Sequence, residues 1–157
     1  MSAPNSTLNK IVVLDTGPLG LVSNPKATPD NIACRQWLEN LVAQGRRVVV
    51  PEIADYEARR ELLRANKTNG ILRLDRVKAA LEYVPITTVA VLLAADLWAQ
   101  ARQQGQPTAD IHALDGDVIL CAQALSLGVA ADELVVATVN VGHLARFLTA
   151  RRWQDIP

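Results

Sequence analysis

The chain has 157 residues, half of them apolar and a fifth charged, which is enough for one folded domain around its own core and excludes a largely disordered chain. Its 16 basic residues balance 16 acidic residues, so the overall charge does not indicate a nucleic-acid partner, and any such interaction must depend on local patches. The two cysteines fit neither a disulfide framework nor a metal site, and no apolar run is long enough to cross a membrane, so we expect a reduced, cytoplasmic protein.

The N-terminal part of the chain predicts a tail, a strand and a turn. Residues 1–10 are polar and contain proline and asparagine, so we expect a flexible tail. Residues 11–14 form a short apolar run rich in β-branched residues, which is typical of a strand buried on both faces of a parallel sheet. This strand ends at Asp15, and residues 16–20, with two glycines and a proline, predict a turn.

Residues 29–43 predict the first helix. Thr28 or Asp30 can cap its N-terminus, and Gly45 ends it. Its apolar face is expected to consist of Ile32, Trp37, Leu38 and Leu41. Residues 47–51 then predict a second buried strand.

The rest of the chain alternates strands with helices. The expected helices cover residues 51–65, 73–82, 89–104, 115–127 and 141–150. The expected strands cover 84–87 and 134–138, and the segment around Trp153 can add an edge strand. Because strands that alternate with helices are joined by crossover connections, the pattern predicts one α/β domain over residues 11–157, with helices packed on a parallel sheet.

Polar residues near the strand ends are the candidates for a functional site. Asp15 closes the first strand, Glu57 lies in the helix after the second, Asp117 opens the helix that leads into the strand over 134–138, and Asn140 follows that strand. Ligands of such sheets bind beyond the carboxyl ends of the strands, and clustered carboxylates repel one another unless protons or cations lie between them. We therefore expect a site for Mg²⁺ or Mn²⁺, which take hard oxygen ligands.

Each acid also has a simpler explanation. Asp15 could only start a turn, and Asp117 could only interact with a helix dipole, as could its neighbour Asp115. Glu57 could be a solvated helix residue, and three other acids lie close to it in sequence: Glu52, Asp55 and Glu61. The site therefore depends on the acids being considered together.

Four segments of the chain resemble, in order, the four motifs of the PIN-domain nucleases, particularly the VapC-type toxins of bacterial toxin–antitoxin pairs. The first is 13–19 (VLDTGPL), an acid after the first strand followed by small residues, and the second is 51–57 (PEIADYE), with a glutamate in a helix after a proline. The third is 117–125 (DVILCAQAL), an aspartate leading a helix, and the last is 136–144 (VATVNVGHL), with a strand, a threonine and an asparagine. Each motif is weak alone, but four in the family order span nearly the whole chain.

The resemblance implies a three-layer α/β/α sandwich with a short, mostly parallel central sheet, and a metal-dependent endoribonuclease that hydrolyses RNA phosphodiester bonds. It implies that Mg²⁺ or Mn²⁺ is held by Asp15, Glu57 and Asp117. Asn140 joins these acids in the catalytic set, and Thr138 and Asp115 support it. It also implies a homodimer and a cognate antitoxin protein that blocks the site.

The chain departs from the family pattern in the last motif. That motif commonly offers an acid at one or both of the positions held here by Asn140 and His143. The second metal position is therefore in question, and an alternative function stays open. In this alternative the chain is a catalytically degenerate PIN domain that binds RNA or a protein without cleaving.

A basic segment follows Glu57 directly and has two interpretations. Residues 58–78 contain seven basic residues and two acids, and the basic residues closest to Glu57 are Arg59, Arg60 and Arg64. They either form a solvated helix face or guide RNA phosphates toward the metal.

Other enzyme and binding classes fit the motifs less well. A haloacid-dehalogenase-type phosphatase needs a second aspartate two residues after the first, where this chain has Gly17. A response-regulator receiver needs an acidic pair and a suitably placed lysine, and we find no convincing set. No G-x-G-x-x-G turn follows a strand, which argues against a dinucleotide-binding fold.

Overall fold

The computed structural model describes residues 10–105 and 111–157, apart from the side chains of residues 111–113. Its centre is a sheet of five strands, β1 (Ile11–Leu14), β2 (Val48–Pro51), β3 (Glu82–Val84), β4 (Leu134–Thr138) and β5 (Ala150–Arg152). They lie in the order β3-β2-β1-β4-β5, and every neighbouring pair is parallel. The expected parallel α/β fold is confirmed, while the expected tail over residues 1–10 lies almost entirely outside the described residues.

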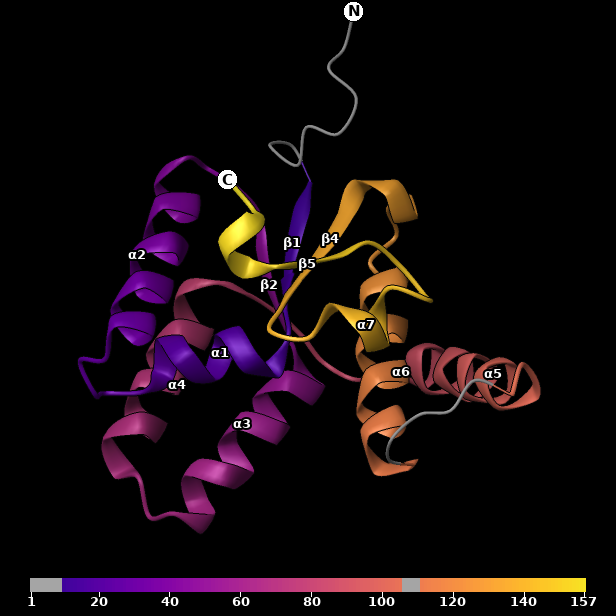
Figure 1. Cartoon of the computed structure of the whole chain (residues 1–157), viewed down its shortest axis with the longest axis horizontal. Helices are drawn as coiled ribbons and strands as arrows, with labels where there is room; N and C mark the ends of the chain where they lie inside the picture. The colour runs from indigo at the N-terminus through magenta and orange to yellow at the C-terminus, as the bar shows by residue number, and fades with distance from the viewer. Residues whose placement is uncertain (1–9, 106–110) are drawn as a thin grey trace, which may run out of the picture.

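Helices cover both faces of this sheet (Figure 1). On the left of Figure 1 lie α1 (Thr16–Ser23), α2 (Pro29–Ala43), α3 (Glu52–Arg64) and α4 (Thr68–Ala80). On the right lie α5 (Thr88–Gln103) and α6 (Ile111–Leu125), with the short α7 (Val141–Leu144) in front of them. Every residue of β1, β2 and β4 is buried, as expected for strands with helices on both sides.

The turn predicted over residues 16–20 is instead the first half of helix α1. The Asp15 side chain caps this helix by accepting the Thr16 backbone N–H at 2.8 Å. Pro18 is tolerated because it lies in the first turn, where its missing N–H has no helical partner. Leu19 and Val22 are buried, so tertiary packing outweighs the low helix propensity of the two glycines.

Helix α2 has the predicted bounds but a different apolar face. Thr28 is the cap, since its Oγ1 accepts the Asn31 N–H at 3.2 Å. Ile32, predicted to be in the core, is 39% exposed, whereas Cys34 is fully buried. Cys34 and Cys121 are both free and buried, as a reduced protein requires.

The C-terminal segment differs most from the sequence prediction. The helix expected over 141–150 ends at Leu144, and the predicted edge strand is β5, which starts at Ala150. The tail is held by the Trp37 indole, whose Nε1–H donates to the Ile156 carbonyl at 2.8 Å while its ring packs 5.7 Å from that of Trp153. The hydrogen bond joins positions 119 residues apart, which local sequence cannot reveal.

Other element bounds shift by a few residues. Helices α4 and α6 begin earlier than predicted, at Thr68 and Ile111, and β3 begins at Glu82 rather than at residue 84. No helix in residues 10–105 and 111–157 has the length and apolar character needed to cross a membrane.

Candidate functional site

Asp15 is fixed at the carboxyl end of the central strand β1. Its backbone N–H continues the β1–β4 ladder by donating to the Ala137 carbonyl at 2.9 Å. Its carboxylate accepts two hydrogen bonds, from the Thr16 N–H and from the Thr138 hydroxyl, both at 2.8 Å. Burial raises the pKa of this carboxyl, and the two hydrogen bonds oppose that rise by favouring the charged form. The side chain is therefore held in one orientation at a strand end, where ligands of such sheets bind.

Glu57 comes to the same place from helix α3. Its Oε1 accepts the Thr16 hydroxyl at 2.9 Å, so Thr16 connects the residue after Asp15 to this second carboxylate. Its Oε2 lies 3.7 Å from the Arg60 guanidinium. Burial raises the pKa of Glu57, and the nearby charge of Asp15 raises it further.

Asp117 is the third carboxylate, and it comes from helix α6. Its Oδ2 lies 3.5 Å from Nδ1 of His143, which follows β4 in helix α7. Burial raises the pKa of Asp117 to about 6, and the charges of Asp15 and Glu57 add to that rise while His143 and Arg146 oppose it. The three acids predicted from the sequence are thus close enough to affect one another electrostatically.

The chemistry of this cluster fits a hard divalent cation. The three carboxylates are partly buried and have raised pKa values, chiefly because burial disfavours their charged forms, and a divalent cation beside them would stabilise those charged forms. Within the described part of the chain, no three acidic, His or Cys side chains converge closely enough to hold an ion as they stand. Mg²⁺ commonly keeps several waters and uses only one or two carboxylates, so this spacing still suits it.

Of the three other residues predicted for the site, only one contacts an acid of the cluster through its side chain. Thr138 is buried and donates to Asp15, which fits its predicted supporting role. Asn140 is exposed, and its backbone N–H donates to the Thr138 hydroxyl at 3.0 Å, while its side chain contacts none of the three acids. Asp115 is exposed and lines a groove with Trp98 of helix α5, separate from the acids.

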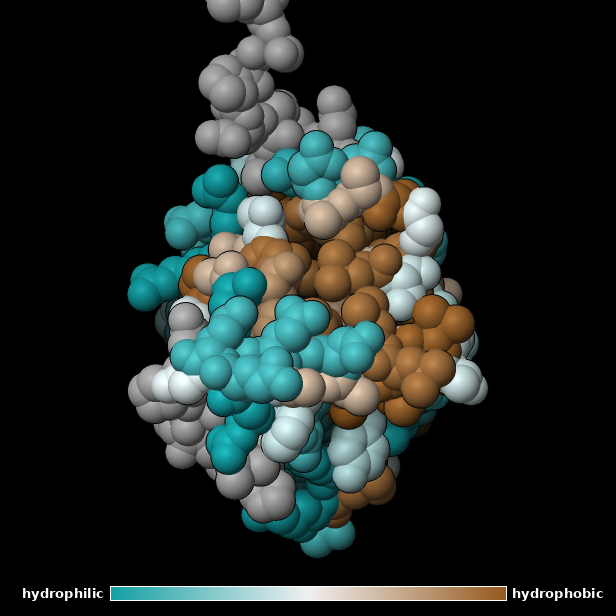
Figure 2. Space-filling model, turned by 90° about the vertical axis from the view of Figure 1, so that its right-hand side faces the viewer, coloured by the Kyte–Doolittle hydropathy of each residue, from teal (hydrophilic) through white to brown (hydrophobic). Residues whose placement is uncertain are grey.

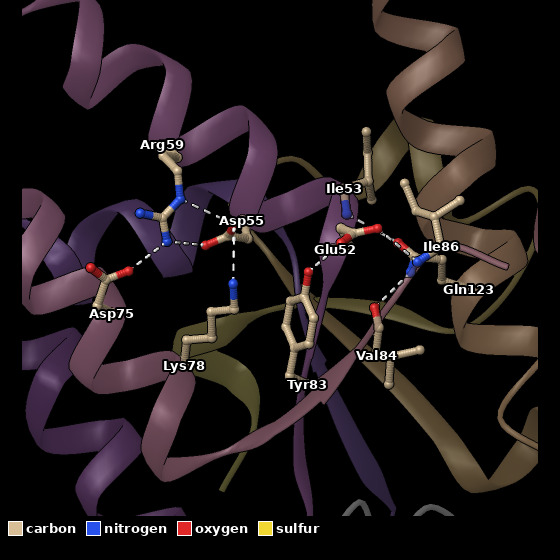
Figure 3. A network of polar contacts seen from close by, with 10 residues as sticks. All are labelled: Glu52, Ile53, Asp55, Arg59, Asp75, Lys78, Tyr83, Val84, Ile86 and Gln123. Carbon is tan, nitrogen blue, oxygen red and sulfur yellow. Dashed lines mark hydrogen bonds and ion pairs between the residues drawn. The ribbon is translucent and has the colours of Figure 1, made fainter.

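The three arginines proposed to guide RNA are not equivalent. Arg59 pairs with Asp55 at 2.9 Å and with Asp75 at 2.7 Å (Figure 3). Arg60 lies beside Glu57 and over the ring of Tyr56. Arg64 is exposed and pairs with Glu61. Arg60 and Arg64 therefore face solvent near the site, whereas Arg59 belongs to a structural network.

Three residues of this region were not singled out as site residues from the sequence. Thr16 donates to Glu57, as described above. Gly116 lies against Glu57, and a Cβ atom added to it would be 2.9 Å from Oε2. The signal for both was their position directly beside a predicted acid.

The third residue is Gln123, a fully buried side chain of α6 that clamps two other elements (Figure 3). Its Oε1 accepts the Ile53 N–H at 3.1 Å, and its Nε2 donates to the Val84 carbonyl at 2.8 Å. Ile53 is in the first turn of α3, which has no side-chain cap of its own, so Gln123 satisfies a helix-terminal N–H from another helix. Nearby, Glu52 accepts the Tyr83 hydroxyl at 2.5 Å and the Ile86 N–H at 2.9 Å.

A comparison with protein-family models matches the PIN domain over residues 12–152. A search of curated proteins finds no match.

Several solved structures resemble the whole chain. A VapBC2 structure from Rickettsia felis, bound to a DNA fragment from its promoter, aligns with a TM-score of 0.69 and 18% identity over 91% of this chain and 98% of that one. VapBC-1 from nontypeable Haemophilus influenzae aligns with a TM-score of 0.63 and 18% identity over 92% and 99%. DNA-bound VapBC from Salmonella typhimurium aligns with a TM-score of 0.60 and 20% identity over 92% of this chain and 98% of that one. At these identities the likeness concerns the fold.

Proposed function

Because this chain belongs to the PIN domain family, we propose that it is a divalent-metal-dependent endoribonuclease and the toxin of a type II toxin–antitoxin pair. The observation that supports this most is the proximity of Asp15, Glu57 and Asp117, which come from three separate elements and lie close enough that the charges of Asp15 and Glu57 raise the pKa of Asp117. Each of the three carboxyl groups has a raised pKa, and acids whose pKa values are shifted by burial and by neighbouring charges are common in functional sites.

In this proposal Asp15, Glu57 and Asp117 would hold Mg²⁺ or Mn²⁺, one or two of them by direct contact and the rest through water bound to the ion. When bound, the ion lowers the pKa of a coordinated water and neutralises charge on the scissile phosphate. The chain's own residues keep the carboxylates in place, since Thr138 holds Asp15 and Thr16 holds Glu57. We assign to Asn140, an exposed residue two positions after β4, the role of orienting a water or the RNA by hydrogen bonding.

The proposed partners are a cognate antitoxin and a second copy of the chain. The similar structures are named as VapBC assemblies, which supports the first proposal. For the second, Figure 2 shows an extensive apolar area on the side of the molecule that carries α5. Helix α5 exposes Val89, Val91 and Leu92 at 68%, 50% and 64%, and such patches commonly mark protein interfaces.

One observation favours a second function, a PIN domain that binds RNA or protein without cleaving. Positions 140 and 143 are Asn and His, and the nearby His143 partly balances the charge of Asp117. With no acid at positions 140 and 143, the site would bind a cation with lower affinity. The chain would then lose catalysis but keep its fold and its binding surfaces.

The test is cleavage of a pool of structured RNAs by the purified, partner-free protein with Mg²⁺, Mn²⁺ or EDTA. Asp15→Asn and Asp117→Asn are compared with Asp30→Asn, which changes an exposed carboxylate on helix α2. We expect metal-dependent cutting that both site variants lose and the control keeps. Absence of cutting by the wild-type protein, with RNA binding retained, would favour the second function, and cutting that survives in Asp15→Asn would contradict the site.

A further inference from the structure

A cavity of about 500 Å³ lies between helices α1 and α3, next to the carboxylate cluster. Its walls are mainly apolar and include Leu21, Pro25, Leu62 and Ala65. Such a volume lies within the range of roughly 300–1,000 Å³ that is common for ligand pockets. It is half open to solvent, so a group from outside can enter it.

The cavity is continuous with the proposed catalytic site. Thr16 and Glu57, which are joined by the 2.9 Å hydrogen bond, line the cavity as well as the carboxylate cluster. A ligand whose phosphate lies at the carboxylates therefore has its adjoining part at the mouth of this cavity. For an RNA strand, that adjoining part is a nucleoside.

The lining of the cavity also includes three basic side chains. Lys26, Arg64 and Lys67 line it and are exposed. Arg64 is paired with Glu61, but among the described residues no carboxylate lies within 4 Å of the ammonium groups of Lys26 and Lys67. The unpaired ammonium groups of Lys26 and Lys67 can bind phosphates while the apolar wall contacts bases, so the cavity suits a nucleic-acid strand.

One polar group in the wall suits a base edge. The side-chain Oδ1 of Asn24 accepts the Lys26 backbone N–H at 3.0 Å, which fixes the orientation of the Asn24 side chain. Within residues 10–105 and 111–157 the side-chain Nδ2 of Asn24 donates no hydrogen bond, so it is left to donate to an acceptor. Bases of single-stranded RNA that leave the stack are recognised by such a combination of apolar contact and edge hydrogen bonding.

We propose that this cavity receives an unpaired base of the RNA substrate, from a nucleotide adjoining the scissile phosphate. The inference rests on the proposed nuclease function and adds to it a pocket for one base beside the scissile phosphate. A base in this cavity would place its own phosphate toward the carboxylates and the next phosphates toward Lys26 and Lys67. Arg64, already paired, would contribute less.

Gly20 allows a sharp test, because it lines the cavity and a Cβ added to it meets no atom within 4 Å. Gly20→Leu would therefore start a side chain in free space at the cavity wall and take up cavity volume, and replacing a helix glycine does not by itself weaken the helix. Ala65→Leu narrows the cavity from the opposite wall, and Ala43→Leu makes the same change at the exposed end of α2 as a matched control.

The measurement compares two fluorescein-labelled probes in Mg²⁺ by fluorescence anisotropy. One is an oligoadenylate of about 12 nucleotides, a length near the site size of single-strand binders, and the other is an abasic ribose-phosphate chain of the same length and charge. All variants carry Asp117→Asn so that binding is measured without cleavage, and circular dichroism confirms the fold. The ratio of the two affinities isolates the contribution of the bases.

We expect the protein without a cavity substitution to bind the oligoadenylate about tenfold more tightly than the abasic chain, which is the contribution of one bound base. Ala43→Leu should show the same ratio. Gly20→Leu and Ala65→Leu should reduce the ratio toward one. If neither cavity variant changes the affinity ratio, the cavity does not bind a base, and the inference is overturned. A segment of a protein partner would then be the candidate occupant of the cavity. Equal binding of both probes by the reference protein would also overturn the inference. If the wild-type protein still cuts RNA in these cases, the nuclease proposal stands without the base site, whereas no binding and no cutting would reject both.

Discussion

Gly116 of helix α6 lies directly against the carboxylate of Glu57 on helix α3, so close that a Cβ atom at position 116 would be 2.9 Å from Oε2. The next residue along α6 is Asp117, so the absence of a side chain at Gly116 lets two of the three acids approach across the helix pair. The distance between the Glu57 carboxylate and helix α6 in the proposed site therefore depends on residue 116 having no side chain larger than a hydrogen atom.

Gly116→Ala should displace the Glu57 carboxylate while the protein stays folded, because the clashing atom is the end of a flexible side chain. We expect Mn²⁺ affinity, measured by isothermal titration calorimetry, to fall by about tenfold, since small misplacements in such sites are costly. The melting temperature should not fall, because alanine favours a helix over glycine by about 0.5–1 kcal/mol. Unchanged affinity would show that Glu57 does not contact the ion.

The pKa of Asp117, raised to about 6 in the folded chain, predicts a pH-dependent stability without metal. Between pH 3.8 and about 6 the folded state binds this proton more tightly than the unfolded state, so the free energy of unfolding falls as the pH rises through that window. The loss is complete above about pH 6 and is at most about 3 kcal/mol.

Asp117→Asn removes this titration, so in EDTA the variant should gain stability over wild type as the pH rises from about 4 to 7. Urea denaturation at several pH values measures the difference. Asp15 and Glu57 have raised pKa values and contribute with the same sign in both proteins. A difference between the two proteins that does not vary with pH would contradict the burial of Asp117.

Gln123→Leu should destabilise the fold by about 2–4 kcal/mol, because it leaves the Ile53 N–H and the Val84 carbonyl buried without their partner. Gln36→Leu, an exposed position on α2, is the matched control and should change stability by less than about 0.5 kcal/mol. Guanidinium denaturation followed by circular dichroism gives both values. Equal, small effects would mean that Gln123 does not clamp α3 and β3.

His143→Asp would restore an acid at the position where the family commonly has one, 3.5 Å from Asp117 in the present geometry. The added negative charge should increase affinity for Mg²⁺ or Mn²⁺ by several-fold, about the effect of one extra carboxylate ligand at a solvated site. His143→Asn is the control, since it removes the imidazole without adding charge. If both variants bind metal alike, the carboxylate at 143 does not reach the ion.

Leu92→Lys should convert a proposed homodimer into a monomer, because Leu92 is 64% exposed on the apolar face of α5 beside Val89. Sedimentation velocity at several protein concentrations distinguishes the two forms. Leu72→Lys, at a position 50% exposed on α4, controls for the general effect of adding a lysine to an exposed leucine. A dimer that withstands Leu92→Lys would place the interface elsewhere.

The sequence by itself determined the fold class and the positions of the three central strands β1, β2 and β4. The runs 11–14, 48–51 and 134–138 are uniformly apolar, which favours buried strands, and strands that alternate with helices favour a parallel sheet. The motifs also predicted Asp15, Glu57 and Asp117 as site residues, and the structure brings them close enough for Asp15 and Glu57 to raise the pKa of Asp117; their role in a site stays a prediction.

Tertiary structure alone decided the features that depend on contacts between distant segments. Helix α1 forms over a segment with two glycines and a proline because Asp15 caps it and its apolar residues are buried, while propensity alone favours a turn. The contacts of Gly116 and Gln123 arise where α6 packs on α3, 59 and 70 residues away along the chain. A local pattern records which face of an element is apolar, but which residue of another element meets it is set by the packing of the whole domain.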